Sequence, residues 1–199
     1  LTAPDTSVIP GSLNIIPTLG PAIQTRTLTL NEVMGPAGPV ALFLDGKEWS
    51  APVTEMPVAG STEIWEIVNL TADTHPIHLH LVQFQLLSRQ RFQVNKYLKA
   101  YNAANPVIPV PPGGTYTPVA VAPYLQGAPV GPDPNEAGWK DTVRMNPGEV
   151  TRIIVRFAPI GTAGVTPYPF NASAEPGYVW HCHILEHEDN EMMRPYKVV

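Results

Sequence analysis

The chain has 199 residues, enough for one domain with a sizeable core, and its single cysteine can form no internal disulfide. The formal net charge is −5 at pH 7 without a basic run, and no apolar stretch approaches a membrane span, so neither nucleic acid nor a membrane is expected as a partner. Proline (24 residues) and glycine (15 residues) are frequent, which disfavours long continuous helices and favours short strands joined by turns.

The first 23 residues are rich in proline and polar side chains and show no signal-peptide pattern. We expect them to form an extension or linker before a single domain that spans residues 24–199. The chain is therefore expected to begin either after processing or inside a longer polypeptide.

Strand-like segments recur from residue 24 onward. Residues 24–30 alternate polar and apolar side chains, and the apolar run 40–44 is followed by Asp45-Gly46, a strong hairpin-turn dipeptide. Further short strands are expected at residues 63–69, 77–87, 150–158 and 177–183. Such regular spacing predicts an all-β sandwich or Greek-key barrel.

Residues 102–138 carry nine of the 24 prolines and have no sustained hydrophobic period. They are predicted to form a long ordered loop. Loops of this length are uncommon unless they have a function. Two interpretations remain open, a proline-stiffened surface insertion and a lid on the substrate side of a site.

All six histidines and the only cysteine lie in two short segments, His-Pro-Ile-His-Leu-His at 75–80 and His-Cys-His-Ile-Leu-Glu-His at 181–187. Met192 follows five residues after His187. Imidazole and thiolate are ligands that soft or borderline transition metals select, and two His, one Cys and a weakly bound Met are the ligands of blue-copper electron-transfer sites. The sequence therefore predicts a copper protein that moves electrons.

The first segment is expected to direct its histidines to two places. Side chains two apart on a strand share a face, so His78 and His80 should project together, with that face continued by Val82, Phe84 and Leu86. His75 precedes Pro76, which favours an extended conformation and interrupts the periodicity. His75 can therefore point away from the other two histidines.

The second segment is expected to connect two metal sites. On a strand, His181 and His183 would share one face and Cys182 would point to the other. A helical turn is predicted over residues 184–191, and such a turn would bring His187 back beside Cys182.

Both motifs, HPxHLH and HCHxxxHxxxxM, resemble the C-terminal copper motifs of the multicopper oxidases in spacing and in order along the chain. The similarity runs from about Arg26 to the C-terminus and includes the segments 44–47, 62–65, 139–142 and 186–189. The sequence of these segments is most similar to that of the last (third) domain of bacterial laccases of the spore-coat type, which are relatives of bilirubin oxidase and phenoxazinone synthase. The resemblance implies a cupredoxin-like Greek-key fold and a secreted, periplasmic or cell- or spore-surface location.

The resemblance also implies a role for each ligand. The type 1 blue copper would be bound by His75, Cys182, His187 and axial Met192; the type 2 copper by His78; and the type 3 pair by His80, His181 and His183. A methionine is more often a packing residue than a ligand, and Met193 is a neighbouring candidate. The five-residue offset from His187 favours Met192.

The implied reaction is one-electron oxidation of a phenolic or pigment-type substrate at type 1 copper, followed by four-electron reduction of dioxygen to water at a trinuclear cluster. In the family that cluster takes eight histidines, four of them from the N-terminal domain. This chain has no further paired histidines. The resemblance therefore implies N-terminal cupredoxin domains of the same protein as partners, and a chain that is incomplete and inactive without them.

Two other classes are weighed against this interpretation. A free-standing blue-copper carrier would need only one set of four ligands, which leaves four histidines unexplained. A copper-storage or purely structural β-domain would need no histidines beside the cysteine. Neither accounts for both motifs.

Several charged residues near the motifs are candidates for supporting roles. By resemblance Glu188 is a proton relay to dioxygen, with a solvated or capping charge as the alternative. Asp73 and Asp141 could orient imidazoles, although turn and strand-start roles are expected instead. Glu191 and Arg194 are expected to be surface charges.

Overall fold

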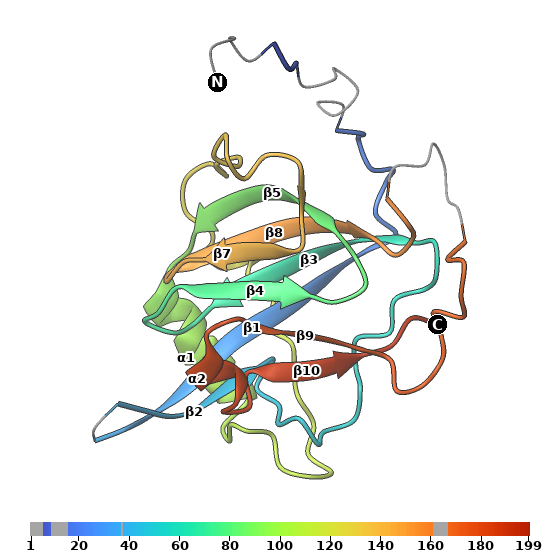
Figure 1. Ribbon diagram of the computed structural model, residues 1–199. Coiled ribbons are helices and arrows are strands. Elements are labelled where there is room, and N and C mark those ends of the chain that lie inside the picture. The colour runs from blue at the N-terminus through green and yellow to red at the C-terminus, as the bar shows by residue number, and fades with distance from the viewer. Residues whose placement is uncertain (1–5, 9–15, 37, 161–166) are drawn as a thin grey trace, which may run out of the picture.

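A computed structural model describes residues 6–8, 16–36, 38–160 and 167–199. The extension expected over residues 1–23 lies largely outside this part of the chain and stays a prediction. Within the described residues the strands form two sheets that enclose the main core (Figure 1). The prediction of an all-β Greek-key sandwich is confirmed.

The larger sheet has the strand order β2-β1-β3-β8-β5-β6. Its members are β1 (Gln24–Gly35), β2 (Gly38–Leu44), β3 (Thr62–Asn69), β5 (Phe84–Arg91), β6 (Trp139–Lys140) and β8 (Glu149–Arg156). β1 and β3 are parallel, and the other neighbouring strands are antiparallel.

The smaller sheet has the order β10-β9-β4-β7 and is antiparallel throughout. Its members are β4 (His75–Leu79), β7 (Thr142–Met145), β9 (Tyr178–Cys182) and β10 (Met193–Tyr196). The chain crosses between the sheets from β3 to β4 to β5 and again from β7 to β8 to β9. These crossings bring both histidine segments onto the central strands of the smaller sheet.

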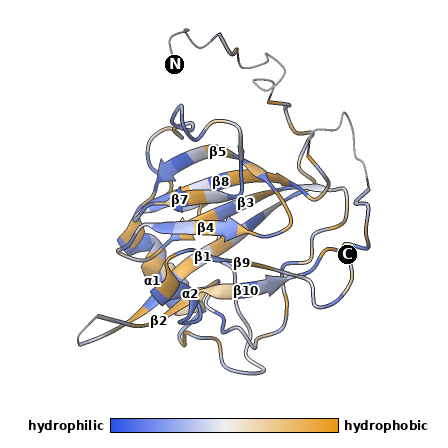
Figure 2. Ribbon diagram, viewed as in Figure 1, coloured by the Kyte–Doolittle hydropathy of each residue, from blue (hydrophilic) through white to orange (hydrophobic). Residues whose placement is uncertain are grey.

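Aromatic side chains fill the space between the sheets. Trp65 from β3 meets Trp180 from β9 edge to face, with ring centroids 5.5 Å apart, and Tyr196 from β10 lies 6.1 Å from Trp65. All three are fully buried. Figure 2 shows hydrophobic residues along β1 and β8 of the larger sheet. Burial of these large rings holds the histidine-bearing sheet against its partner.

The single strand predicted over 77–87 is in fact two strands in different sheets. Leu81 has φ of +65°, and the N–H of Val82 donates to the carbonyl of His80 at 2.7 Å. This tight turn ends the extended backbone after β4. The prediction that the face of His80 continues along Val82, Phe84 and Leu86 is therefore wrong, because those three residues are buried and His80 is exposed.

The turn predicted at Asp45-Gly46 forms, but no hairpin follows it. Both residues have positive φ, 55° and 62°, and an isolated bridge pairs Leu44 with Lys47. The chain then runs through a loop until β3. The hairpin of this region instead joins β1 to β2.

An 11-residue helix, α1 (Val94–Ala104), was not predicted and overlaps the start of the proline-rich segment. Its buried side chains, Tyr97 and Tyr101, pack in a second cluster with Phe92 and Val121. The spacing of Val94, Tyr97 and Tyr101 is helical, but it is shorter than the windows in which helices stand out. The short helix α2 (Leu185–Glu188) lies inside the predicted helical turn over 184–191.

The proline-rich segment is ordered, as predicted, and has one 3₁₀ turn at Ala122–Tyr124. A buried ion pair fastens its end to β5. The guanidinium of Arg89 donates two hydrogen bonds of 2.6 Å to the carboxylate of Glu136. These bonds, with burial opposing them, lower the pKa of Glu136 from 4.5 to about 2.

Because the pKa of Glu136 is lower in the folded chain, the ion pair stabilises the fold above pH 4.5 and this contribution is lost as the pH falls toward 2. We expect Glu136→Gln to lower the free energy of unfolding by about 3 kcal/mol at pH 7. The difference from the parent should shrink in urea titrations at pH 3. Asp133→Asn, which alters an exposed pair with Arg144, should cost less than about 0.5 kcal/mol. An equal loss for both variants, or a pH-independent loss for Glu136→Gln, would contradict this account.

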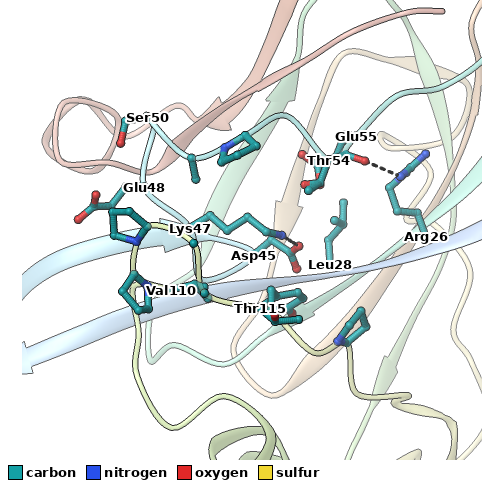
Figure 3. A pocket seen from close by; sticks show the side chains of 18 of the residues that line it. Arg26, Leu28, Asp45, Lys47, Glu48, Ser50, Thr54, Glu55, Val110 and Thr115 are labelled. Carbon is teal, nitrogen blue, oxygen red and sulfur yellow. Dashed lines mark hydrogen bonds and ion pairs between the residues drawn. The ribbon is translucent and has the colours of Figure 1, made fainter.

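A cavity of about 680 Å³ lies between residues 45–55 and the proline-rich residues 110–118 (Figure 3). Among the described residues that line it there is no histidine and no cysteine. None of the helices in the described part of the chain combines the length and apolar character needed to cross a membrane.

Candidate metal centre

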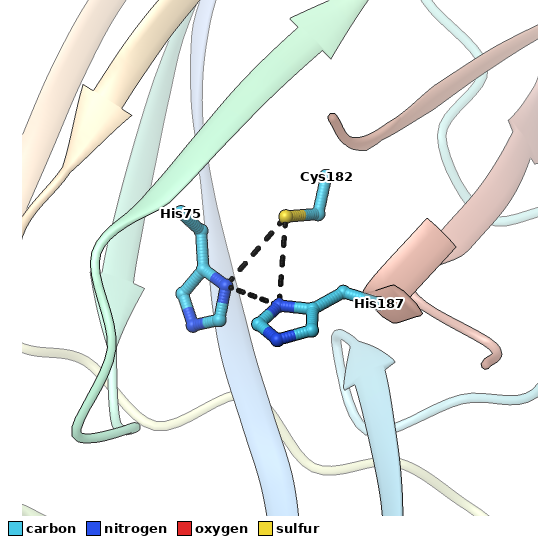
Figure 4. Close-up of side chains that lie close together, drawn as sticks. All are labelled: His75, Cys182 and His187. Atoms are coloured by element: carbon cyan, nitrogen blue, oxygen red, sulfur yellow. Dashed lines mark hydrogen bonds between the residues drawn. The ribbon is translucent and has the colours of Figure 1, made fainter. Parts of the chain in front are cut away.

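Three side chains converge at one end of the sandwich. His75 Nδ1 lies 3.6 Å from Cys182 Sγ, His187 Nδ1 lies 3.8 Å from Cys182 Sγ, and the two Nδ1 atoms are 3.2 Å apart (Figure 4). β4 supplies His75, β9 supplies Cys182, and α2 brings His187 back beside the thiol. The proximity expected from the helical turn is thus observed.

The spacing of the three ligand atoms suits a metal ion. In protein zinc sites, bonds to nitrogen are about 2.0–2.1 Å and bonds to sulfur about 2.3 Å. A metal with such bonds at the centre of a planar triangle would set the nitrogens about 3.5 Å apart and each about 3.7 Å from the sulfur. The three measured distances are close to these values. Two imidazoles and one thiolate are also the equatorial ligands of a blue-copper site.

Burial favours the uncharged forms of His75 and Cys182. It lowers the pKa of His75 to about 4, with a further contribution from the neighbouring His187. Burial also raises the pKa of the Cys182 thiol to about 11. A neutral imidazole is the form that binds metals, and the thiolate needs a cation to become stable in this environment.

A hydrogen-bond chain fixes the tautomer of His75, and sequence reasoning missed its residues. The Thr71 hydroxyl donates to Asn69 Oδ1 at 2.9 Å, and His75 Nε2 lies 2.6 Å from the same hydroxyl oxygen. Asn69 is itself oriented because its amide donates to two main-chain carbonyls. Nε2 must therefore carry the proton, which leaves the Nδ1 lone pair directed toward Cys182 and His187. A threonine four residues before a histidine is too common a pattern to be noticed in one sequence.

A second group gathers on the opposite face of the smaller sheet. In the register of β4 and β9, His78 lies opposite His181 and Ile77 opposite Cys182. Side chains directly opposite each other share a face, so the histidine pair faces away from the thiol. His80 joins the pair, with its Nε2 3.3 Å from His181 Nε2. One ligand atom from each of the three histidines lies within 4.8 Å of the others, as a metal site requires.

Main-chain carbonyls orient two of these imidazoles. Nδ1 of His78 lies 2.9 Å from the carbonyl oxygen of Asp141, and Nδ1 of His181 lies 3.0 Å from that of Cys182. Since carbonyls only accept, each Nδ1 carries the proton and each Nε2 has an unprotonated lone pair that could bind a metal. Asp141 thus contacts an imidazole through its backbone, while its carboxylate is 3.9 Å from His78 Nδ1. The Asp73 carbonyl accepts from Asn69, consistent with the expected turn role.

His183 and Glu188 lie at the edge of the second group. The His183 ring is exposed, with its centroid 5.4 Å from that of His181 and 5.7 Å from that of His78. The Glu188 carboxylate is 3.3 Å from His181 Nδ1. Glu188 is therefore in direct contact with a histidine of this group.

The two methionines after α2 differ in environment. Met192 is fully buried in the same core cluster as Cys182. Met193 is partly buried and pairs with His181 in the register of β9 and β10. The expectation that Arg194 is a surface charge is wrong, because this residue is fully buried and donates hydrogen bonds to main-chain carbonyls of residues 48–52.

Comparison with known proteins places these motifs in a family. Residues 21–199 match the family model described as multicopper oxidase. Multicopper oxidase LPR1 of Arabidopsis thaliana is 38% identical over 201 residues, covering 98% of this chain and 33% of the relative. The laccase of Bacillus subtilis (strain 168) is 41% identical over 173 residues, covering 87% of this chain and 27% of the relative. The chain thus spans about a third of the length of these relatives.

Solved structures agree in fold. The McoA multicopper oxidase from the hyperthermophile Aquifex aeolicus superposes with a TM-score of 0.57 at 26% identity, covering 92% of this chain and 31% of that one. A multi-copper oxidase from Pediococcus acidilactici gives a TM-score of 0.58 at 26% identity, covering 98% of this chain and 30% of that one. With a family match over nearly the whole sequence, the chain belongs to the multicopper oxidases, a family that uses copper.

Proposed function

We propose that the chain is the copper-binding domain of a laccase-like multicopper oxidase that oxidises a phenolic or pigment-type substrate in one-electron steps and passes the electrons to a site where dioxygen is reduced to water. The observation that carries this proposal is the arrangement of residues 181–183. Cys182 faces a two-imidazole group on one side of the sheet, and His181 faces a histidine group on the other. One short segment of backbone thus connects two metal-binding groups.

The first group is proposed as the type 1 site. Its ligands would be His75, Cys182, His187 and, axially, Met192. The strand register supports Met192 over Met193, because Met193 lies opposite His181 and shares its face, while the preceding residue lies on the side of Cys182. Copper held here supplies one-electron redox chemistry.

The second group is proposed as half of a trinuclear site. His78 would bind type 2 copper, and His80, His181 and His183 would bind the type 3 pair. Their free Nε2 atoms support this assignment for His78 and His181. The other ligands would come from N-terminal cupredoxin domains of a longer protein. This gathering of histidines disfavours a free-standing electron carrier, which has no use for a second group.

The proposal predicts that a phenol reduces the copper-loaded chain. Mixing the blue protein with 2,6-dimethoxyphenol in a stopped-flow instrument should bleach the colour once per type 1 copper, because the Cys182 site accepts one electron. Re-oxidation with ferricyanide should restore the colour. A blue chain that phenols leave unbleached would contradict a laccase-like role.

Glu188 is proposed as a proton relay, since its carboxylate contacts a proposed cluster ligand and is partly exposed to solvent. In the enzyme completed with its N-terminal domains, Glu188→Gln should lower the rate of oxygen reduction roughly 10²-fold, the scale typical of a general acid or base. Glu186→Gln, on the same short helix but exposed, is the matched control and should retain the parent rate. Equal rates for both variants would leave Glu188 without this role.

A further inference from the structure

Arg194, a buried residue two positions after Met192, binds the loop formed by residues 48–52. Arg194 has no exposed surface, and its guanidinium donates to the carbonyls of Glu48, Trp49, Ala51 and Pro52, the last three at 3.1, 2.9 and 2.7 Å. A planar fork of donors is suited to several carbonyls at once, whereas a lysine ammonium is a single point.

Glu191, the residue directly before Met192, binds the same loop. The N–H of Trp49 donates to Glu191 Oε2 at 2.6 Å. Glu191 has φ of +70°, a left-handed backbone conformation that costs energy for a residue with a side chain. Residues on both sides of Met192 are thus bound to one five-residue loop.

One side of the 48–52 loop faces a cavity. Glu48, Ser50, Ala51 and Pro52 line the cavity of about 680 Å³, so that side faces open space rather than packed side chains (Figure 3). The main chain of Met192, in contrast, bonds directly to the proposed copper ligands. Its N–H donates to the carbonyl of His187, and its carbonyl accepts from the N–H of Cys182, both at 3.0 Å. Movement of the loop would therefore be transmitted to Met192.

We propose that Arg194 and Glu191 are positioning residues that hold Met192 in place as the axial ligand by clamping the 48–52 loop from both sides. This inference rests on the proposed type 1 site. The contacts of Arg194 and Glu191 with the 48–52 loop are called the clamp. Because the axial ligand tunes the reduction potential of a blue-copper site, the clamp would tune the reduction potential of copper in the proposed type 1 site.

The sign of a potential shift separates the clamp from the charge of the arginine. Loss of an axial thioether stabilises Cu(I) over Cu(II), so Met192→Leu should raise the potential. Loss of a nearby buried cation would stabilise Cu(II) and lower the potential. Arg194→Lys keeps the charge but cannot reach four carbonyls. The clamp therefore predicts a rise in Arg194→Lys, toward the value of Met192→Leu.

The test is a redox titration of the copper-loaded chain, followed by its visible and electron paramagnetic resonance spectra, for the parent, Met192→Leu, Arg194→Lys and the double variant. The double variant should show no rise beyond Met192→Leu, because the clamp acts through Met192. Glu191→Asp keeps the negative charge but has a shorter reach to the Trp49 N–H, so it should shift the potential in the same direction. It provides a second test of the clamp if Arg194→Lys is unstable. Arg152→Lys, whose parent side chain pairs with Glu66 on the larger sheet, is the matched control and should leave the potential unchanged.

The outcomes are distinguishable. An unchanged potential in Met192→Leu would overturn the axial assignment itself. A raised potential in Met192→Leu, with parent potentials and spectra in Arg194→Lys and Glu191→Asp, would overturn the clamp while leaving the proposed function intact. A lowered potential in Arg194→Lys, or a shift that adds to that of Met192→Leu, would also overturn the clamp, because it would show that the substitution acts on the copper site by a route other than Met192.

Discussion

Replacing Cys182 with serine will abolish the intense blue colour that the chain develops with Cu(II). The colour arises from charge transfer between a thiolate and copper in a trigonal site with two imidazoles, and Cys182 is the only cysteine of the chain. Its Sγ lies within 3.8 Å of both Nδ1 atoms of the histidine pair, and the chain has no second thiol to replace it.

The control for this change is Met193→Leu, which removes a neighbouring sulfur on the face of His181. That variant should remain as blue as the parent. The measurement is a visible absorption spectrum at matched copper content. A Cys182→Ser protein that stays blue would show that the type 1 assignment is wrong.

The copper-loaded chain by itself will show no sustained oxygen uptake with a phenolic substrate. Four histidines are available for the second site, namely His78, His80, His181 and His183, and the resemblance to multicopper oxidases implies four more from an N-terminal domain. His80 and His183 are exposed and directly follow the last residues of β4 and β9, where a partner domain could reach them. We therefore expect an incomplete cluster and no four-electron reduction of dioxygen.

This prediction is tested by measuring oxygen uptake with an oxygen electrode. The positive control is the same measurement after the N-terminal domains are added as a separate protein. Uptake should begin when those domains are added and should disappear again in the His183→Ala variant. Continuous uptake by the chain alone, with water as the product, would contradict the proposed division of ligands and would require a cluster formed between copies of this domain.

The separation of the two proposed metal-binding groups could be predicted from sequence because side chains on a strand alternate between faces with a fixed period of two. Alternation alone separates His181 from Cys182, and the pairing of β4 with β9 places them as expected. The clustering of every histidine in two segments predicts metal binding without any knowledge of the fold. The helical turn that returns His187 also follows from a short local segment.

The contacts of Arg194 could not be predicted because they join residues far apart in sequence. Arg194 binds a loop about 145 residues earlier, and nothing near it in the sequence distinguishes a buried arginine from a surface one. The turn at Leu81 is equally hidden, since leucine rarely adopts positive φ. It divides an alternating segment that otherwise looks like one strand.

The most direct test of the account is a crystal structure of the copper-loaded chain with anomalous diffraction measured at the copper edge. The account predicts a copper peak bonded to Cys182 Sγ and to Nδ1 of His75 and His187, with the Met192 sulfur on the axis. Copper found only on the exposed His80 and His183, with no peak among the ligand atoms of His75, Cys182 and His187, would contradict it.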